Sequence, residues 1–193
     1  MSARQLDLLA VGCSWGGLAA AGRLLEALPP ELDLPTVIVQ HRGESPSGLV
    51  QLLARHTARP VSEPDDKDQV RRNHVYVAPP GYHLLVDRQR FSLATEAPVR
   101  YSRPSVDVLF ESAAEAFGPS LAAVVLTGAN ADGAAGLACV AAAGGLALVQ
   151  DPATAERSAM PAAALAAVPN AVVGDIEELA RRLAAAATGA VAP

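Results

Sequence analysis

The sequence predicts an α/β protein with a doubly wound, mainly parallel sheet flanked by helices and carrying an inserted antiparallel hairpin. Apolar runs alternate with helical patterns along the 193-residue chain, and βα repetition of this kind builds parallel sheets. The composition is 51% apolar but only 4% aromatic, which suits a helix-covered parallel sheet better than a β-sandwich. The length fits one domain that buries a continuous core without disulfides or metal ions.

The predicted elements follow in chain order. The apolar run Leu6–Val11 reads as a strand, and a glycine-rich turn leads from it into an Ala/Leu-rich helix at Leu18–Leu28. Later strands are short apolar runs bounded by turn residues, and Pro161 opens one of the later helices. Further strands are expected at Thr36–Gln40, Leu121–Leu126, Leu146–Gln150 and Ala171–Val173, helices at Ser47–Thr57, Ala134–Ala143, Pro161–Ala167 and Ile176–Ala187, and a charged surface connection at Pro60–Arg72.

Between residues 73 and 94 the pattern changes. Segments 74–78 and 83–87 read as strands on either side of Pro79-Pro80-Gly81, which predicts an antiparallel hairpin. Residues 90–94 are a candidate third strand. We expect this hairpin to be an insertion that packs against the sheet rather than a second domain.

Charge and cysteine content exclude several classes of protein. The net charge is −5 and no Lys/Arg cluster is large enough to follow a phosphate backbone, which argues against nucleic-acid binding. Cys13 and Cys139 lack the spacing of metal ligands and are expected to be reduced. A buried structural Cys13 is a simpler interpretation than a reactive thiol. With no signal-peptide pattern and no apolar stretch approaching ~20 residues, the sequence predicts a cytoplasmic protein without membrane insertion.

The turn after the first strand carries the strongest chemical signal. Residues 12–16 spell G-x-S-x-G around Ser14, which is the nucleophile-elbow pattern of serine hydrolases. Glycines let the backbone turn sharply there, and the following helix N-terminus offers N–H groups to an oxyanion. The motif alone is equally typical of a turn that binds phosphate or packs a helix on a sheet. A nucleophilic serine also needs a general base and an orienting carboxylate.

His41 is the histidine best placed to be the base. Catalytic groups gather at the carboxyl ends of strands in doubly wound sheets, and His41 directly follows the strand 36–40. His56 lies in a helical pattern and is expected at the surface. His74 and His83 belong to the predicted hairpin, where half-buried structural roles are the simpler interpretation, although His83 could reach a cleft.

The same rule selects Asp132 as the carboxylate, because it follows the strand 121–126 in a second glycine-rich turn. A helix N-cap is the alternative role for this aspartate. Asp151 is a competing candidate, but Pro152 follows it and favours a turn residue. The order Ser, His, Asp differs from that of α/β-hydrolases and argues against that fold. The chemistry of a triad depends on geometry rather than order.

These residues resemble the catalytic domain of the CheB-type protein-glutamate methylesterases of bacterial chemotaxis. The resemblance implies that Ser14 is the nucleophile, His41 the general base and Asp132 the orienting carboxylate. It spans about residues 8–183 and rests on six blocks, namely Gly12–Gly17, Val39–His41, Val75–His83, Arg103–Asp107, Leu126–Gly136 and Gln150–Ala155.

The resemblance also carries expectations about activity and partners. It implies hydrolysis of γ-glutamyl methyl esters on the cytoplasmic helices of methyl-accepting chemoreceptors, with no metal or organic cofactor. Some members of the family also deamidate receptor glutamine. Typical members have an N-terminal receiver domain, whereas this chain starts almost at the catalytic strand. We therefore expect residues 1–193 to form a single catalytic domain without a receiver domain.

Two departures from the family pattern lie beside the expected cleft. Trp15 stands where the family usually has a small threonine or serine, and Ala129-Asn130 replaces a methionine-glycine pair. Substrate shape, oxyanion geometry or rate are expected to differ accordingly. Backbone N–H groups near Trp15 or Ala129 are the candidate oxyanion donors.

Two other function classes stay open. One is a weakly active or non-catalytic receptor-binding module in which Trp15 occludes the nucleophile. The other is a nucleotide-binding domain, which is less well supported because the turn at 12–17 lacks the G-x-G-x-x-G spacing and no lysine completes a P-loop. The oligomeric state is left open by the sequence.

Overall fold

The computed structural model describes residues 6–43 and 48–188. Short apolar runs form strands in it, and Ala/Leu-rich segments form most of the helices between them. In chain order the elements are β1 (Leu8–Cys13), α1 (Gly17–Ala27), β2 (Thr36–Gln40), α2 (Leu49–Leu53), η1 (Ala54–His56), β3 (Val61–Ser62), β4 (Val75–Val77), β5 (His83–Val86), β6 (Phe91–Ala94), α3 (Val106–Phe117), η2 (Gly118–Ser120), β7 (Leu121–Val125), α4 (Ala134–Ala142), β8 (Leu146–Gln150), α5 (Ala159–Ala167), β9 (Val172–Gly174) and α6 (Ile176–Thr188).

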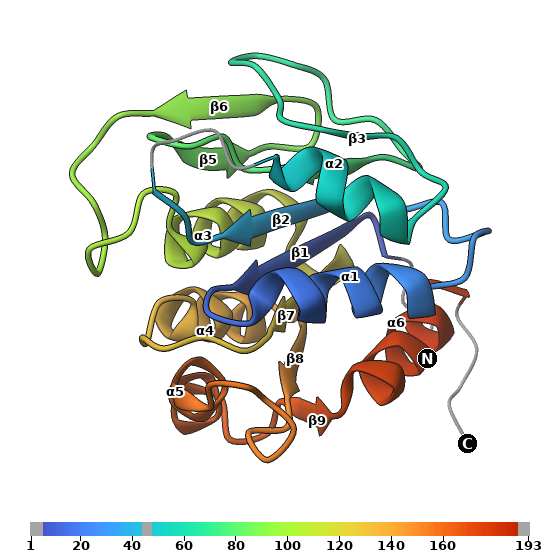
Figure 1. The fold of residues 1–193 in the computed structure, drawn as a ribbon, viewed down its shortest axis with the longest axis vertical. Coiled ribbons are helices and arrows are strands. Elements are labelled where there is room, and N and C mark those ends of the chain that lie inside the picture. The colour runs from blue at the N-terminus through green and yellow to red at the C-terminus, as the bar shows by residue number, and fades with distance from the viewer. Residues whose placement is uncertain (1–5, 44–47, 189–193) are drawn as a thin grey trace.

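A parallel sheet forms the centre of the molecule (Figure 1). In the part of the chain that the structure describes, its seven strands follow the order β3-β4-β2-β1-β7-β8-β9, and neighbouring strands pair in parallel. The chain leaves β1 toward β2 on one side and later returns to β7 on the other. Such a reversal of strand order is where ligands bind in doubly wound sheets. The predicted fold class is confirmed.

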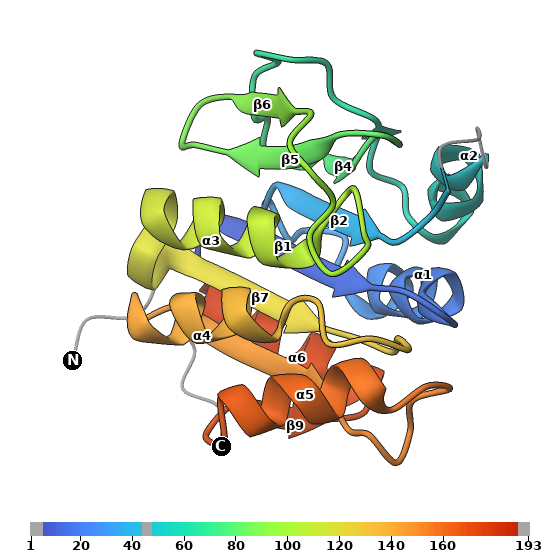
Figure 2. The same ribbon diagram turned by 90° about the vertical axis from the view of Figure 1, so that its left-hand side faces the viewer.

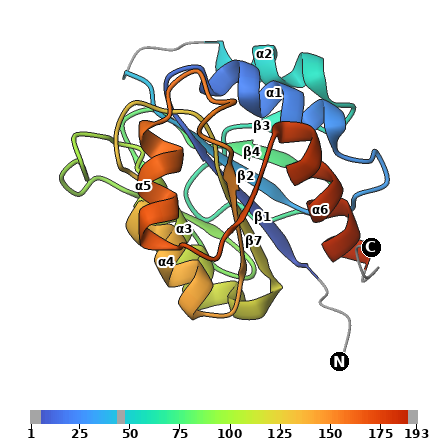
Figure 3. The same ribbon diagram turned by 90° about the horizontal axis from the view of Figure 1, so that it is seen from below.

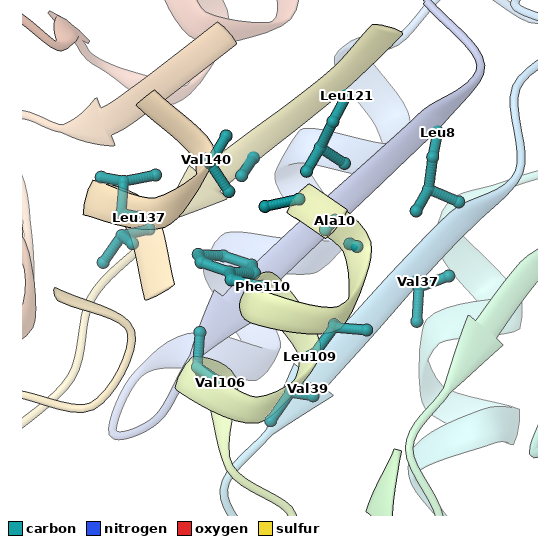
Figure 4. Close-up of a cluster of buried hydrophobic side chains, with 14 of the residues drawn as sticks. Leu8, Ala10, Val37, Val39, Val106, Leu109, Phe110, Leu121, Leu137 and Val140 are labelled. Carbon is teal, nitrogen blue, oxygen red and sulfur yellow. The ribbon is translucent and has the colours of Figure 1, made fainter. Parts of the chain in front are cut away.

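Helices cover both faces of the sheet (Figure 3). Helices α3, α4 and α5 lie on one face, and α1, α2 and α6 lie on the other. Alternate residues of β1 serve the two layers: Leu8 and Ala10 join the core under α3 and α4, whereas Leu9 and Val11 join the core under α1 and α6. Figure 4 shows the first core, with Phe110 of α3 packed among aliphatic side chains. Because both faces are covered, the central strands are apolar throughout.

The pairing predicted for the hairpin within residues 73–94 is wrong. Strand β4 pairs in parallel with β2 and β3, and the antiparallel partner of β5 is β6. All three residues of β4 are buried, as in a central strand, and Pro79 and Pro80 follow it, which lack the N–H groups that a tight hairpin uses. The reversal occurs at Asp87 instead, whose Oδ1 accepts hydrogen bonds from the N–H groups of Gln89 and Arg90 at 2.7 Å.

The β5–β6 hairpin packs on α3, as Figure 2 shows. Its side chains Leu84, Val86 and Phe91 join the same core as α3. The short strand β3 lies within the stretch 60–72 that was predicted as a surface connection. A strand of two residues carries too little pattern to be recognised in the sequence.

Helix α3 is absent from the sequence interpretation, although its signals are present. Ser105 is its N-cap and accepts a hydrogen bond from the N–H of Val108, and Asp107 lies in the first turn. Both are ordinary marks of a helix start. The helix predicted for Ser47–Thr57 is shorter and ends in a 3-10 turn, with Ser47 outside the described residues. None of the helices within 6–43 and 48–188 is long and apolar enough to cross a membrane.

Candidate active site

Ser14 and His41 directly follow the carboxyl ends of two neighbouring strands, β1 and β2. In the register of β1 and β2, Cys13 pairs with Gln40, and the N–H of His41 donates to the carbonyl oxygen of Cys13 at 3.0 Å. On the other side, the N–H of Ser14 donates to the carbonyl oxygen of Thr127, just after β7, also at 3.0 Å. The carboxyl ends of β2, β1 and β7 therefore converge on Ser14, as the strand order predicts.

The backbone around Ser14 is held from three directions. Its carbonyl oxygen accepts hydrogen bonds from the N–H of Gly17 and from Nε2 of Gln40, both at 2.8 Å. Gly128 approaches from the turn after β7: a Cβ there would lie 2.9 Å from Cβ of Ser14 and 1.9 Å from Sδ of Met160. Only glycine allows this turn to pass so close to the serine.

His41 and Asp132 form a short charge-assisted hydrogen bond. Nε2 of His41 lies 2.6 Å from Oδ2 of Asp132, and their side chains are 9% and 0% exposed. An ionised carboxylate only accepts hydrogen bonds, so Nε2 carries the proton and Nδ1 keeps the lone pair. Nδ2 of Asn130, which can only donate, lies 3.2 Å from Nδ1.

The N-terminus of α3 holds the Asp132 carboxylate. Oδ2 accepts from the N–H of Val106 at 2.7 Å, and Oδ1 accepts from the N–H of Asp107 at 3.0 Å and from Oγ of Ser105 at 2.8 Å. Burial alone would raise the pKa of Asp132, but the hydrogen bonds from His41, Asp107 and Val106 hold this pKa below its usual value. The alternative N-cap role does not hold, since α4 starts after Gly133 and has no side-chain cap.

The first glycine of the G-x-S-x-G motif makes room for this helix terminus. A Cβ on Gly12 would lie 2.2 Å from Cγ1 of Val106. Val106 is β-branched and has little rotamer freedom in a helix. A side chain at position 12 would therefore push away the same helical turn that donates to Asp132.

Asp107 is a second buried carboxylate behind Asp132. Its Oδ1 accepts from the N–H groups of Gly133 at 2.9 Å and Gly136 at 2.7 Å, which ties α3 to α4. Nε of Arg100 lies 3.3 Å from Oδ2. Burial, followed by the nearby charge of Asp132, raises the pKa of Asp107 even though the Gly136 N–H and Arg100 oppose the shift.

We expect Asp107→Asn to stabilise the protein near neutral pH. A carboxyl whose pKa is raised on folding lowers the free energy of unfolding once the pH exceeds its ordinary value of 3.8. The amide oxygen can still accept from Gly133 and Gly136 but carries no charge beside Asp132. Urea unfolding at about pH 7 and about pH 4 should show a gain for the variant that shrinks as the pH falls. A variant less stable than the parent at neutral pH would contradict this.

The Trp15 side chain contacts the loop between β8 and α5. Its side chain is exposed, its Nε1 donates to Oε1 of Glu156 at 2.8 Å, and the guanidinium of Arg157 lies 5.4 Å from the centre of its ring. Oγ1 of Thr127 donates to the carbonyl oxygen of Trp15 at 3.0 Å. The loop between β8 and α5 thus fixes the residue that follows Ser14.

Several residues of the site were missed as functional positions in the sequence. Gln40 holds the serine carbonyl, Thr127 joins two turns, and Oε1 of Gln150 accepts from the N–H of Thr127 at 2.9 Å. Oγ of Ser105 and the backbone N–H of Asp107 both donate to the Asp132 carboxylate. Gln40 and Gln150 are polar residues that end their strands directly after a run of apolar residues, and that position was the signal available.

The other histidines and Asp151 have structural partners elsewhere. Nδ1 of His56 pairs with Glu26 at the surface, and Nε2 of His74 lies 2.9 Å from Oγ of Ser62. Nε2 of the buried His83 lies 3.1 Å from the carbonyl oxygen of Ala97. Oδ1 of Asp151 accepts from the N–H of Ala153 at 2.9 Å, as a turn residue does. Cys13 is buried, and burial raises the pKa of its thiol to about 12.

A cavity of about 410 Å³ opens beside His41. Arg42 and Arg103 contribute positive charge to its wall, and the fully exposed Tyr101 lies at its edge. The cavity therefore leaves open space next to the His41 side chain. The residues that line it are His41, Arg42, Gly43, Pro98, Tyr101, Ser102, Arg103 and Pro104.

Comparisons with known proteins agree with this geometry. The sequence model described as CheB methylesterase matches residues 9–183. A Leptospira interrogans protein, whose name pairs protein-glutamate methylesterase with protein-glutamine glutaminase, is 42% identical over 90% of this chain and 91% of its own length. The protein-glutamate methylesterase/protein-glutamine glutaminase 2 of Anaeromyxobacter dehalogenans is 37% identical over 84% of this chain but only 48% of its own length.

The fold comparison points the same way. The crystal structure of the Thermotoga maritima CheB methylesterase catalytic domain superposes with a TM-score of 0.86 at 27% sequence identity, and the match covers 93% of this chain and 98% of that chain. The family model, the relatives and the fold therefore coincide over nearly the same residues. On these grounds the chain belongs to the CheB methylesterase family.

Proposed function

We propose that this chain is a serine hydrolase that removes methyl groups from glutamate γ-methyl esters of chemoreceptors and also deamidates receptor glutamine. The observation that carries the proposal is the convergence of Ser14, His41 and Asp132 at the carboxyl ends of three adjacent strands. The names of the relatives supply the substrate class. The partner is the cytoplasmic helical region of a methyl-accepting chemoreceptor, and the site of action is the cytoplasm.

In the proposed mechanism His41 serves as base and then as acid. Nδ1 takes the proton of the Ser14 hydroxyl as Oγ attacks the ester carbonyl. When the ester C–O bond breaks, the imidazolium gives that proton to the departing methoxide oxygen, which leaves as methanol. The resulting acyl-enzyme is hydrolysed by a water molecule that His41 deprotonates in turn. The ionised Asp132 keeps Nε2 protonated and stabilises the imidazolium, as its 2.6 Å contact suggests.

Two backbone N–H groups support stabilisation of the oxyanion. Within the described part of the chain, the N–H groups of Trp15 and Ala129 donate to no protein acceptor, and both lie in the turns that flank Ser14. A donor of this kind contributes roughly 3 kcal/mol to transition-state stabilisation. We assign these two N–H groups to the developing negative charge.

One domain is sufficient for this proposal. The sheet, α3 and the β5–β6 hairpin share one core, so the site and its supports fold together. We propose that residues 1–193 act as a single catalytic domain. The assembled set of Ser14, His41 and Asp132 argues against a non-catalytic receptor-binding module.

The proposal is tested by methanol release from a methylated cytoplasmic chemoreceptor fragment. The folded chain should release methanol with the methylated fragment and none with the same fragment carrying free glutamates. A fragment with glutamine at those positions should release ammonia if the second activity is present. A folded chain that releases no methanol while it binds the fragment would favour the non-catalytic module instead.

A further inference from the structure

Asn130 closes a ring of hydrogen bonds with the two residues that assist Ser14. Nε2 of His41 donates to Oδ2 of Asp132 at 2.6 Å, and the backbone N–H of Asp132 donates to Oδ1 of Asn130 at 3.1 Å. Nδ2 of Asn130 then lies 3.2 Å from Nδ1 of His41 and completes the ring. Asn130 is half-buried in the turn between β7 and α4.

The orientation of the Asn130 amide follows from its partners. The N–H of Asp132 can only donate, so it requires the amide oxygen, and the amide nitrogen must then face His41. The same reasoning places the His41 proton on Nε2, because the Asp132 carboxylate only accepts. Donor and acceptor roles agree around the whole ring.

The Asn130 amide occupies Nδ1 of His41, the atom that the proposed mechanism needs as a base. With Nε2 protonated, Nδ1 holds the one lone pair of the ring that can take the Ser14 proton, and Asn130 donates to that lone pair. Among residues 6–43 and 48–188, the Ser14 hydroxyl and the His41 ring form no hydrogen bond with each other. His41 therefore carries its proton on the nitrogen that the mechanism requires, but its free lone pair is bonded to Asn130 rather than to Ser14.

We propose that Asn130 is a positioning residue that keeps the base of the resting site occupied and is displaced when the receptor ester binds. The inference rests on the proposed function. Displacement needs only rotation of one half-buried side chain, because the bonds to be broken are those of its own amide. The neighbouring Ala129 N–H, assigned above to the oxyanion, places the bound acyl group next to this side chain. A small ester that does not reach Asn130 meets a blocked base.

A purely structural role for Asn130 makes the opposite prediction, which two variants separate. Asn130→Asp keeps an oxygen for the Asp132 N–H but places an acceptor against Nδ1, so the ring must carry a proton there and loses its base. Asn130→Gly removes both bonds and frees Nδ1. If Asn130 only supports the turn, the aspartate variant should resemble the parent and the glycine variant should lose activity.

The test is the first-turnover acylation of Ser14 by p-nitrophenyl acetate, a small ester. We expect Asn130→Gly to react about three- to tenfold faster than the parent, the factor expected when one ordinary hydrogen bond no longer competes. Asn130→Asp should react at least about a hundredfold more slowly, the usual contribution of a general base. The gain of the glycine variant should be smaller with the methylated receptor fragment, which displaces Asn130 by itself.

Two further measurements exclude simpler explanations. ¹⁵N NMR of the His41 ring should show a bare Nδ1 in the parent and a protonated Nδ1 in Asn130→Asp, a change that a structural role would not cause. Asn130→Ala replaces the glycine variant if the latter fails to fold. A glycine or alanine variant that is folded but no faster overturns the role of Asn130. Absence of Ser14-dependent acylation in both the parent and the Asn130→Gly variant overturns the proposed function itself.

Discussion

Replacing Ser14 with alanine is expected to abolish ester hydrolysis while the fold stays intact. The change removes only Oγ, whereas the bonds that hold the turn use the backbone N–H and carbonyl of residue 14. Loss of the nucleophile in a comparable triad lowers kcat about 10⁶-fold. Methanol release from the methylated receptor fragment and p-nitrophenyl acetate acylation should both fall to the level without enzyme.

Ser120→Ala is the matched control for this prediction. Ser120 lies just before β7, at the opposite edge of the sheet from Ser14, and its Oγ donates to the carbonyl oxygen of Phe117 at 2.8 Å. Its replacement should leave the rate unchanged. The urea unfolding midpoint of the Ser14→Ala variant should be close to that of the parent. Substantial Ser14-independent hydrolysis would show that another group is the nucleophile.

Asp132→Asn is expected to lower kcat about 10⁴-fold, as in a serine protease whose triad aspartate is changed in the same way. Donors converge on both oxygens of this carboxylate: His41 and Val106 on Oδ2, and Ser105 and Asp107 on Oδ1. The asparagine side chain has an N–H₂ group in place of one oxygen, and this group cannot accept from the two donors that face it. Either the helix terminus loses its acceptor or His41 loses the partner that fixes its tautomer.

The Asp132 variant should also differ from the parent in how its stability depends on pH. Hydrogen bonds hold the pKa of Asp132 below 3.8, so its contribution to the free energy of unfolding is present above that pH and is lost as the pH falls through the folded value. Urea unfolding should therefore show the largest difference between parent and variant near neutral pH. Asp151→Asn is the control, since the Asp151 carboxylate accepts from the N–H of Ala153 in its own loop. A similar loss of activity in both variants would contradict the assignment of Asp132.

The sheet and the three proposed catalytic positions could be predicted because one geometric rule connects them. Parallel strands place their carboxyl ends at one edge, so the residues after three buried strands had to meet. The strands themselves were recognisable as apolar runs buried on both faces. Strand ends together with the residue types that follow them point to Ser14, His41 and Asp132, without knowledge of their side-chain contacts.

The supports of the site could not be predicted in this way, because they depend on contacts between segments far apart in the chain. Nothing local in the sequence shows that the first turn of α3 donates to a carboxylate about 26 residues later. The same holds for β4, whose short apolar sequence suits a hairpin and a parallel sheet equally well and whose partners are decided by burial on both faces. The role of Asn130 likewise depends on where three hydrogen bonds meet.

The position of Trp15 has a practical consequence for spectroscopy. It is the single tryptophan of the chain, it adjoins the proposed nucleophile, and its indole is 59% exposed beside a carboxylate and a guanidinium. The intrinsic tryptophan fluorescence of the folded protein thus originates from one place, the turn that carries Ser14. Under the proposed function, emission intensity and wavelength should report docking of a receptor helix at that turn without any attached label, in every variant that leaves Trp15 in place.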